Sequence, residues 1–227
     1  MNKKTMSNVV LRLSVLFLLA FSFRSYAQQL PNPGRFEGDI ARFEVQDRAN
    51  PPPEGAIVLT GSSSIARWNN QAPAVLAPLT VIPRGFGGSV MNDVLHYLDR
   101  VALNYKPRAI LIYEGDNDTG SRNPIPKELI LDQLAQIITK VHEELPETRI
   151  YVLSVKPSIL RWGVWSEAQA VNAGYKAMAD NDPLVYYVDV ATPFLNSDGA
   201  VMDLSLIHIS EPTRRTPISY AVFCMKK

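Results

Sequence analysis

The sequence of 227 residues contains one cysteine, Cys224, close to its end. A single thiol cannot build an internal disulfide framework, so a packed core must stabilise the chain. The 176 residues from position 28 to position 203 contain no cysteine at all. That length is sufficient for one domain with a hydrophobic core of its own.

The sequence also has no apolar run of membrane-spanning length. The run Leu13–Phe23 is shorter than the roughly 20 apolar residues that a transmembrane helix needs. Basic residues precede this run, and the small residues of Ser25-Tyr26-Ala27 follow it. This order predicts a secretory signal peptide over residues 1–27, and hence a secreted or periplasmic protein without a stable membrane anchor after cleavage. An uncleaved N-terminal anchor is the alternative.

No basic segment stands out between the two ends of the chain. Residues 28–203 hold 15 basic and 21 acidic side chains, a net charge of −6, although the whole chain carries +1. A mildly acidic domain offers no electrostatic surface for nucleic acid or for an anionic membrane. We therefore expect no nucleic-acid partner.

The last 24 residues, from Leu204 to Lys227, resemble a translated sequencing adapter. We predict that residues 204–227 are a non-native tail and that residues 28–203 are the truncated natural domain. The alternative is a genuine C-terminal helix and loop, but Pro212 and Pro217 would interrupt any helix there.

Short apolar, β-rich runs alternate with helical patterns along residues 56–190. The predicted strands are Ala56–Thr60, Leu79–Ile82, Ala109–Tyr113, Ile150–Ser154 and Val185–Val190. The predicted helices are a short one around Ile40–Val45, one or two within Ser89–Asn104, one over Pro126–Glu144 and one over Glu167–Asp180. Such alternation predicts an α/β fold, a doubly wound, mainly parallel sheet of five strands.

Three segments whose residues could bind a ligand or take part in a reaction follow the first three predicted strands. They are Gly61–Ile65 with three serines, Arg84–Ser89 with three glycines, and Glu114–Asp118 with alternating carboxylates. Parallel strands present their carboxyl ends at one edge, so the three segments should face one crevice. Taken singly, each has another reading: a helix N-cap for the serines, a phosphate-binding loop for the glycines, and a turn or calcium loop for the third. The spacing of the glycines fits neither a dinucleotide fingerprint nor a P-loop.

Together these segments resemble the conserved blocks of the SGNH (GDSL-like) hydrolases over roughly Ala56 to Asp203. The resemblance implies a flavodoxin-like, three-layer fold and serine esterase activity on small-molecule or glycan esters, with no cofactor and no metal. Ser63 matches the nucleophile, Gly88 the glycine of the second block, and Asn117 the asparagine of the third. The Ser63 and Gly88 N–H groups and the Asn117 amide would then form the oxyanion hole.

Two departures from the family pattern weaken this expectation. Pro83 stands where many relatives have Asn. More seriously, the family's Asp-x-x-His block is absent: Asp203 and His208 are five apart, and His96 and His142 lie in predicted helices as solvated surface residues. We therefore expect this chain to lack the catalytic Asp and His and the family's last helix, and to have little activity.

Two other functions remain open. One is a non-catalytic carbohydrate- or ligand-binding protein on the same scaffold. The other is a flavodoxin-like cofactor protein, which no further feature of the sequence favours.

Overall fold

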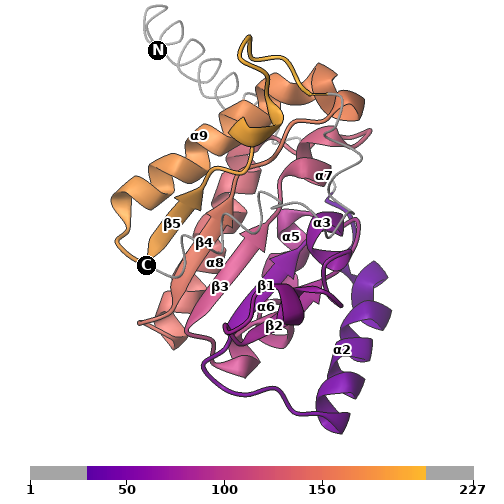
Figure 1. Cartoon of the computed structure of the whole chain (residues 1–227), viewed down its shortest axis with the longest axis vertical. Helices are drawn as coiled ribbons and strands as arrows, with labels where there is room; N and C mark the ends of the chain where they lie inside the picture. The colour runs from indigo at the N-terminus through magenta and orange to yellow at the C-terminus, as the bar shows by residue number, and fades with distance from the viewer. Residues whose placement is uncertain (1–29, 203–227) are drawn as a thin grey trace, which may run out of the picture. The chain divides into compact units, whose positions relative to one another are not determined.

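A five-stranded sheet forms the centre of the computed structural model, which describes residues 30–202 (Figure 1). All neighbouring strands are parallel and their order is β2-β1-β3-β4-β5. The strands are β1 (Ile57–Gly61), β2 (Val81–Gly85), β3 (Ala109–Tyr113), β4 (Arg149–Leu153) and β5 (Val185–Val188). Every residue of β1 and β3 is buried, as expected for central parallel strands covered on both faces.

Helices occupy the four predicted helical segments, and further short helices lie outside them. The helices are η1 (Pro33–Phe36), α2 (Glu37–Ala49), α3 (Ser63–Ala66), α4 (Ala72–Val75), α5 (Met91–His96), α6 (Leu98–Val101), η2 (Leu103–Tyr105), α7 (Asp116–Gly120), α8 (Lys127–Glu144), η3 (Ile159–Val164), α9 (Trp165–Asn181) and η4 (Thr192–Phe194). The first predicted helix is longer than expected, since α2 has 13 residues. Ion pairs of Arg100 on α6 with Glu37 and Glu44 hold α2 in place, a tertiary contact that helical periodicity does not reveal.

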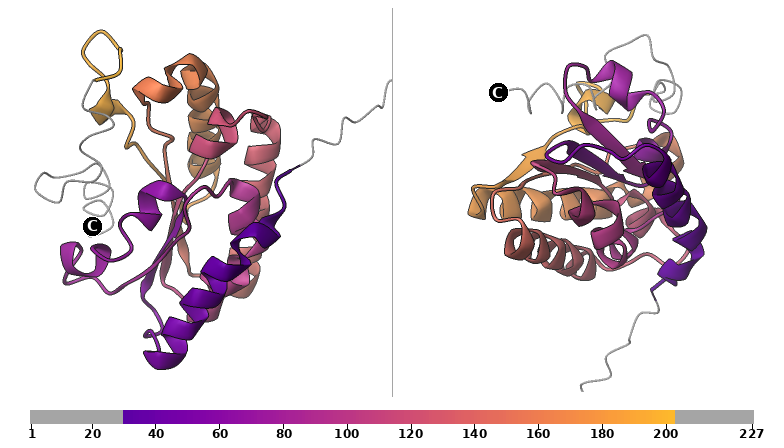
Figure 2. Two further views of the ribbon diagram at one scale, coloured as in Figure 1. Left: turned by 90° about the vertical axis from the view of Figure 1, so that its right-hand side faces the viewer. Right: turned by 90° about the horizontal axis from the view of Figure 1, so that it is seen from below.

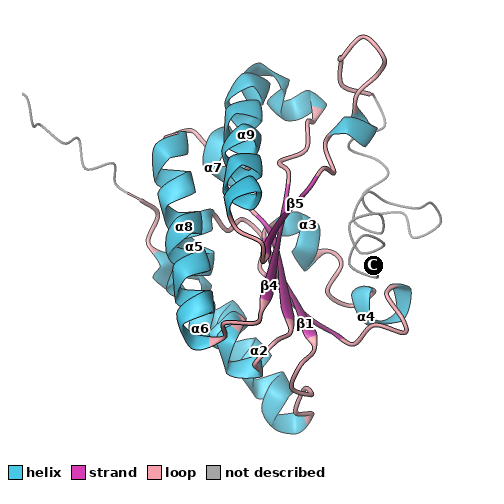
Figure 3. Ribbon diagram, turned by 90° about the vertical axis from the view of Figure 1, so that its left-hand side faces the viewer, coloured by secondary structure: helices cyan, strands magenta, loops and turns pink. Residues whose placement is uncertain are grey.

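Helices cover both faces of the sheet, which confirms the doubly wound α/β architecture. Figure 3 shows α3 and α4 on one face and α5, α6, α8 and α9 on the other. This division follows from the right-handedness of parallel crossovers. The β1-to-β2 connection runs toward one edge of the sheet, and the later connections run toward the other edge, so their helices must lie on opposite faces.

Alternate strand residues build the two halves of the core. Ile57, Leu59, Leu111 and Leu153 pack with residues of α3 and α4 in one buried cluster. Because side chains alternate along a strand, Val58, Ile110, Ile112 and Val152 face the other layer. There α8 contributes its own buried stripe of Ile130, Leu134, Ile137 and Val141.

Arg84, the residue before the glycine-rich loop, is fixed by a buried polar cluster at the β2 edge. Its Nε donates a hydrogen bond to the Tyr105 hydroxyl at 2.8 Å, and its guanidinium pairs with Asp47 of α2. Tyr105 in turn donates to Asp47 at 2.6 Å, and burial raises the pKa of Tyr105 to about 12. Figure 2 shows α2 lying along this edge of the sheet. The loop after β2 therefore starts from a rigid base.

Pro83 lies within β2, opposite Leu59 of β1. Proline cannot donate a hydrogen bond to a neighbouring strand, and it is tolerated in β2 because this strand is at the edge of the sheet.

The signal peptide, Asp203, His208, the tail and the expected loss of the last helix all lie outside the described residues. Among residues 30–202, no helix is both long and apolar enough to cross a membrane.

Candidate active site

The register of the sheet brings the three predicted segments to one edge. Gly61 at the end of β1 is level with Gly85 at the end of β2 and with Tyr113 at the end of β3. Ser63, Gly88 and Asn117 all follow these ends within a few residues. Figure 1 shows the resulting elements α3 and α7 at the same end of the sheet.

Ser63 is the most accessible of the three consecutive serines. Ser62 and Ser64 are buried, whereas Ser63 is partly exposed as the first residue of α3. Its backbone N–H has no acceptor among the described residues, and neither has its hydroxyl. Because α3 is a single turn, its macrodipole is small, and the free N–H group itself is the relevant donor.

The glycine-rich loop packs directly against Ser63. A side chain at Gly85 would place its Cβ 2.3 Å from the Ala66 nitrogen, so only glycine lets α3 approach β2 this closely. A Cβ at Gly87 would lie 3.9 Å from the Ser63 Cα. Gly88 has a φ of +93°, which favours glycine, and its N–H has no acceptor in the described part of the chain. Two free backbone donors therefore stand on adjacent segments.

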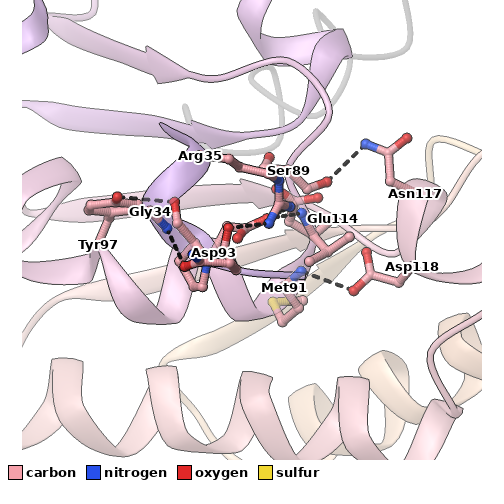
Figure 4. Close-up of polar contacts among 12 residues, drawn as sticks. Gly34, Arg35, Ser89, Met91, Asp93, Tyr97, Glu114, Asn117 and Asp118 are labelled. Atoms are coloured by element: carbon pink, nitrogen blue, oxygen red, sulfur yellow. Dashed lines mark hydrogen bonds and ion pairs between the residues drawn. The ribbon is translucent and has the colours of Figure 1, made fainter. Parts of the chain in front are cut away.

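The Asn117 side chain is held at both ends of its amide. Its Nδ2 donates to the Ser89 carbonyl oxygen at 2.8 Å (Figure 4). Its Oδ1 accepts a hydrogen bond from Arg161 at 2.8 Å. This fixes which way the amide points and leaves one N–H for a ligand. Arg161 lies on η3, far along the chain, and is also paired with Asp116 at 2.5 Å. No motif in the sequence marks Arg161, so the sequence analysis missed it.

We expect Arg161→Gln to release the Asn117 amide, because the acceptor end of that amide loses its charged donor. Loss of a complete oxyanion donor costs about 10²- to 10³-fold in kcat, so if Asn117 has the role that the family resemblance implies, loosening it should cost about 10-fold. The measurement is the Asn117 side-chain signal in a nitrogen-15 NMR spectrum, together with kcat in an active form of the protein. Arg122→Gln, at an exposed arginine beyond α7 with no side-chain partner among the described residues, is the control. An unmoved Asn117 signal in Arg161→Gln would contradict the assignment.

Buried carboxyl groups bind the second and third segments together. Asp118 accepts a hydrogen bond from the Met91 N–H group, and the Ser89 hydroxyl donates to Glu114 (Figure 4). Asp118 also accepts a hydrogen bond from the Gly115 N–H group; both bonds to Asp118 are 2.9 Å long. The bond to Gly115 is a local contact within the third segment. The bonds to Met91 and Ser89 reach across to the neighbouring segment, and sequence spacing could not show them.

Burial shifts both of these carboxyl groups toward their neutral forms. It raises the pKa of Asp118 to about 6, against the lowering effect of the two N–H donors. It also raises the pKa of Glu114 well above the ordinary value, and the nearby Asp118 adds to this shift. Both groups therefore bind protons more tightly in the folded state than in the unfolded chain.

The unfolding free energy should fall as the pH rises from about 4.5 to 6. In this window folded Asp118 is still largely protonated while the unfolded side chain has ionised, so increasing pH favours the unfolded state. Asp118→Asn should flatten the slope, because amide side chains do not titrate. Urea denaturation at several pH values measures this slope, with Asp198→Asn at an exposed aspartate as the control. An equally steep slope in Asp118→Asn would contradict the assignment of this pH dependence to Asp118.

Neither of the two described histidines forms a hydrogen bond with Ser63. His96 on α5 packs edge-on against Tyr97, and the His142 Nδ1 on α8 lies 3.6 Å from an Asp182 carboxylate oxygen. The expectation that His142 is a solvated surface residue is wrong in part, because its Nε2 is buried and without a hydrogen-bond partner. Packing of α8 against α9 and the chain around Asp182 explains this burial.

The described residues form no cluster of potential metal ligands. No group of three or more His, Cys, Asp or Glu side chains between positions 30 and 202 has an arrangement that could hold a metal ion.

Comparison with known proteins places the chain in a family. The model of the GDSL-like lipase/acylhydrolase family matches residues 54–213, including Ser63, Gly88 and Asn117. The chain therefore belongs to the GDSL-like lipase/acylhydrolase family, and by family it is a carboxylic ester hydrolase. The match extends ten residues past Asp203 and so includes His208; the non-native origin of the tail stays a prediction. A search of curated protein sequences found no match.

Solved structures share the fold at low sequence identity. A Streptococcus pneumonia protein named for platelet activating factor has a TM-score of 0.70 at 18% identity, covering 94% of this chain and 99% of its own. A GDSL-like lipase from Bacteroides thetaiotaomicron has a TM-score of 0.68 at 18% identity, covering 83% and 95%. A variant acetyl-xylooligosaccharide esterase from Geobacillus Stearmophilus has a TM-score of 0.54 at 12% identity, covering 75% and 95%. At these identities the similarity establishes the fold.

Proposed function

We propose that the natural protein is an exported serine esterase that hydrolyses carboxylic esters through an acyl-enzyme on Ser63. O-acetyl groups on glycans and small lipid or aryl esters are the proposed substrates. The observation that carries the proposal is the meeting of an accessible serine, two free N–H donors and a fixed asparagine amide at one edge of the sheet.

Each of these groups has one task in the reaction. The Ser63 Oγ attacks the ester carbonyl carbon, and its proton passes to a base. The carbonyl oxygen becomes an oxyanion that accepts hydrogen bonds from the Ser63 N–H, the Gly88 N–H and the Asn117 amide. The C–O bond then breaks, the alcohol leaves with a proton, and water hydrolyses the acyl-enzyme to release the acid.

The general base is not found among residues 30–202. In residues 30–202 the Ser63 hydroxyl has no hydrogen-bond partner, and in the family an Asp-x-x-His block supplies the base. We propose that this block followed Asp203 in the natural protein and that the present chain is inactive or nearly so. Triads without their base retain only about 10³- to 10⁴-fold acceleration over water.

Export of the protein is proposed from the sequence alone. The basic, apolar and small-residue order of residues 1–27 supports a signal peptide, and the acidic domain suits a substrate outside the cytoplasm.

Sequencing the source gene past the codon for Asp203, followed by an assay of its product with p-nitrophenyl acetate and an O-acetylated xylan, tests the proposal. We expect an Asp-x-x-His block and turnover that the present chain does not match. If the gene confirms residues 204–227 and its product does not hydrolyse these esters, the esterase proposal is wrong. The unpartnered Ser63 hydroxyl then favours the second candidate, a carbohydrate- or ligand-binding protein.

A further inference from the structure

Lys156 stands at the active-site edge of the sheet, and the reaction described above does not use it. It follows the end of β4 by three residues. Its Nζ lies 6.0 Å from the centre of the Tyr113 ring, and Tyr113 is level with Gly61, two residues before Ser63. Lys156 is therefore placed over the strand end next to the nucleophile.

The Lys156 ammonium is partly buried and lies over the face of the Tyr113 ring. It has no hydrogen bond and no ion pair within residues 30–202. Burial lowers its pKa; Asp116 opposes that effect, and Arg161 and Arg67 add to it. Withdrawing an ammonium from water without a hydrogen-bond acceptor is unfavourable. An anionic ligand would stabilise the charged form by accepting its hydrogen bonds.

The cations around Lys156 are not equally free. Arg161 is already bound to Asp116 and Asn117, so its guanidinium is occupied. Arg67 is exposed and has no side-chain partner among the described residues. It lies one helical turn from Ser63, since its N–H donates to the Ser63 carbonyl oxygen at 3.0 Å. Lys156 and Arg67 are thus two cations near the proposed reaction centre whose side chains have no hydrogen bond or ion pair among the described residues.

Resting on the proposed esterase function, we propose that Lys156 and Arg67 form a subsite for a carboxylate carried by the substrate, such as that of a uronic acid in an acylated glycan. The ammonium and the guanidinium donate N–H hydrogen bonds to the oxygens of a carboxylate or of a phosphate alike, so a phosphate ester is the competing ligand that the test must separate from the carboxylate. The subsite would select acidic esters over neutral ones of the same size.

The test measures binding, which does not require catalysis. The full chain is titrated with methyl glucuronide, with the neutral methyl glucoside and with glycerophosphocholine, and affinities are read from nitrogen-15 NMR shifts. We expect the glucuronide to bind at least ten times more tightly than the glucoside, and Lys156→Met to remove that preference. Lys140→Met is the control, because Lys140 on α8 pairs with Asp99 on α6, away from the site. Thermal denaturation checks that each variant is folded.

The pKa of Lys156 gives a second readout that a purely structural lysine would not show. Asp116 on α7, Arg161 on η3, Arg67 on α3 and Tyr113 on β3 are the charged and titratable groups around it. Binding of the glucuronide should raise the pKa of Lys156, since the anion stabilises the ammonium form, and the glucoside should leave it unchanged.

Three results would overturn the subsite: equal affinity for the two sugars, an undiminished preference in Lys156→Met, or tighter binding of glycerophosphocholine than of the glucuronide. Ser63→Ala should keep the preference while hydrolysis in the natural protein is lost. A failed subsite and a failed esterase proposal are therefore distinguishable.

Discussion

Ser63→Ala should lower kcat for p-nitrophenyl acetate by about 10³- to 10⁶-fold in a form of the protein that has its general base. In the proposed mechanism the Ser63 oxygen forms the covalent intermediate, and no neighbouring group replaces it. Ser63 is the accessible serine at the start of α3, beside the glycine loop.

Ser62→Ala and Ser64→Ala test whether a neighbouring serine, rather than Ser63, is the nucleophile. Both hydroxyls are buried, and the Ser62 Oγ has no hydrogen-bond partner, so its removal should leave the fold intact. If Ser64→Ala abolishes hydrolysis and Ser63→Ala does not, the nucleophile is assigned to the wrong residue.

In the present chain, Ser63→Ala should have almost no further effect on the rate of ester hydrolysis. Members of a catalytic triad act as a unit, so the serine contributes little once the base is missing. A low hydrolysis rate that is equal in the unchanged chain, in Ser63→Ala and in His208→Ala is the expected pattern. A large drop in His208→Ala would instead show that His208 acts as the base.

Gly61→Ala should destabilise the domain by more than about 4 kcal/mol or prevent it from folding. Gly61 has a φ of +126°, and a Cβ there would lie 2.2 Å from the Tyr113 carbonyl oxygen of β3. The clash is with backbone in the middle of the sheet, so no side-chain rotation can relieve it. Urea denaturation measures the loss.

Gly38→Ala is the matched control for this substitution. Gly38 lies in α2, and a Cβ there would meet no atom within 4 Å. Alanine in a helix is favoured over glycine by roughly 0.5–1 kcal/mol, so this variant should be slightly more stable. Equal stability of Gly61→Ala and Gly38→Ala would refute the close approach of β1 to β3.

The strands were well predicted because their signal is local. The run Ala109–Tyr113 was assigned correctly at both ends, since a fully buried parallel strand is a continuous apolar run. β2 begins two residues later than predicted and extends to Gly85, because pairing with β1 rather than composition sets its limits. The site segments were found for the same local reason: glycines and polar residues directly follow each apolar run.

The sequence by itself determined the α/β class, the family and the presence of the Ser63, Gly88 and Asn117 segments, because these depend on composition, order and short-range spacing. Only the tertiary structure decided how the segments are held. Arg161 orients Asn117 from 44 residues away, Asp118 ties Met91 to the third segment, and Lys156 lies over the Tyr113 ring. These contacts join residues that only the parallel register brings together, and no linear pattern encodes which side chains then meet.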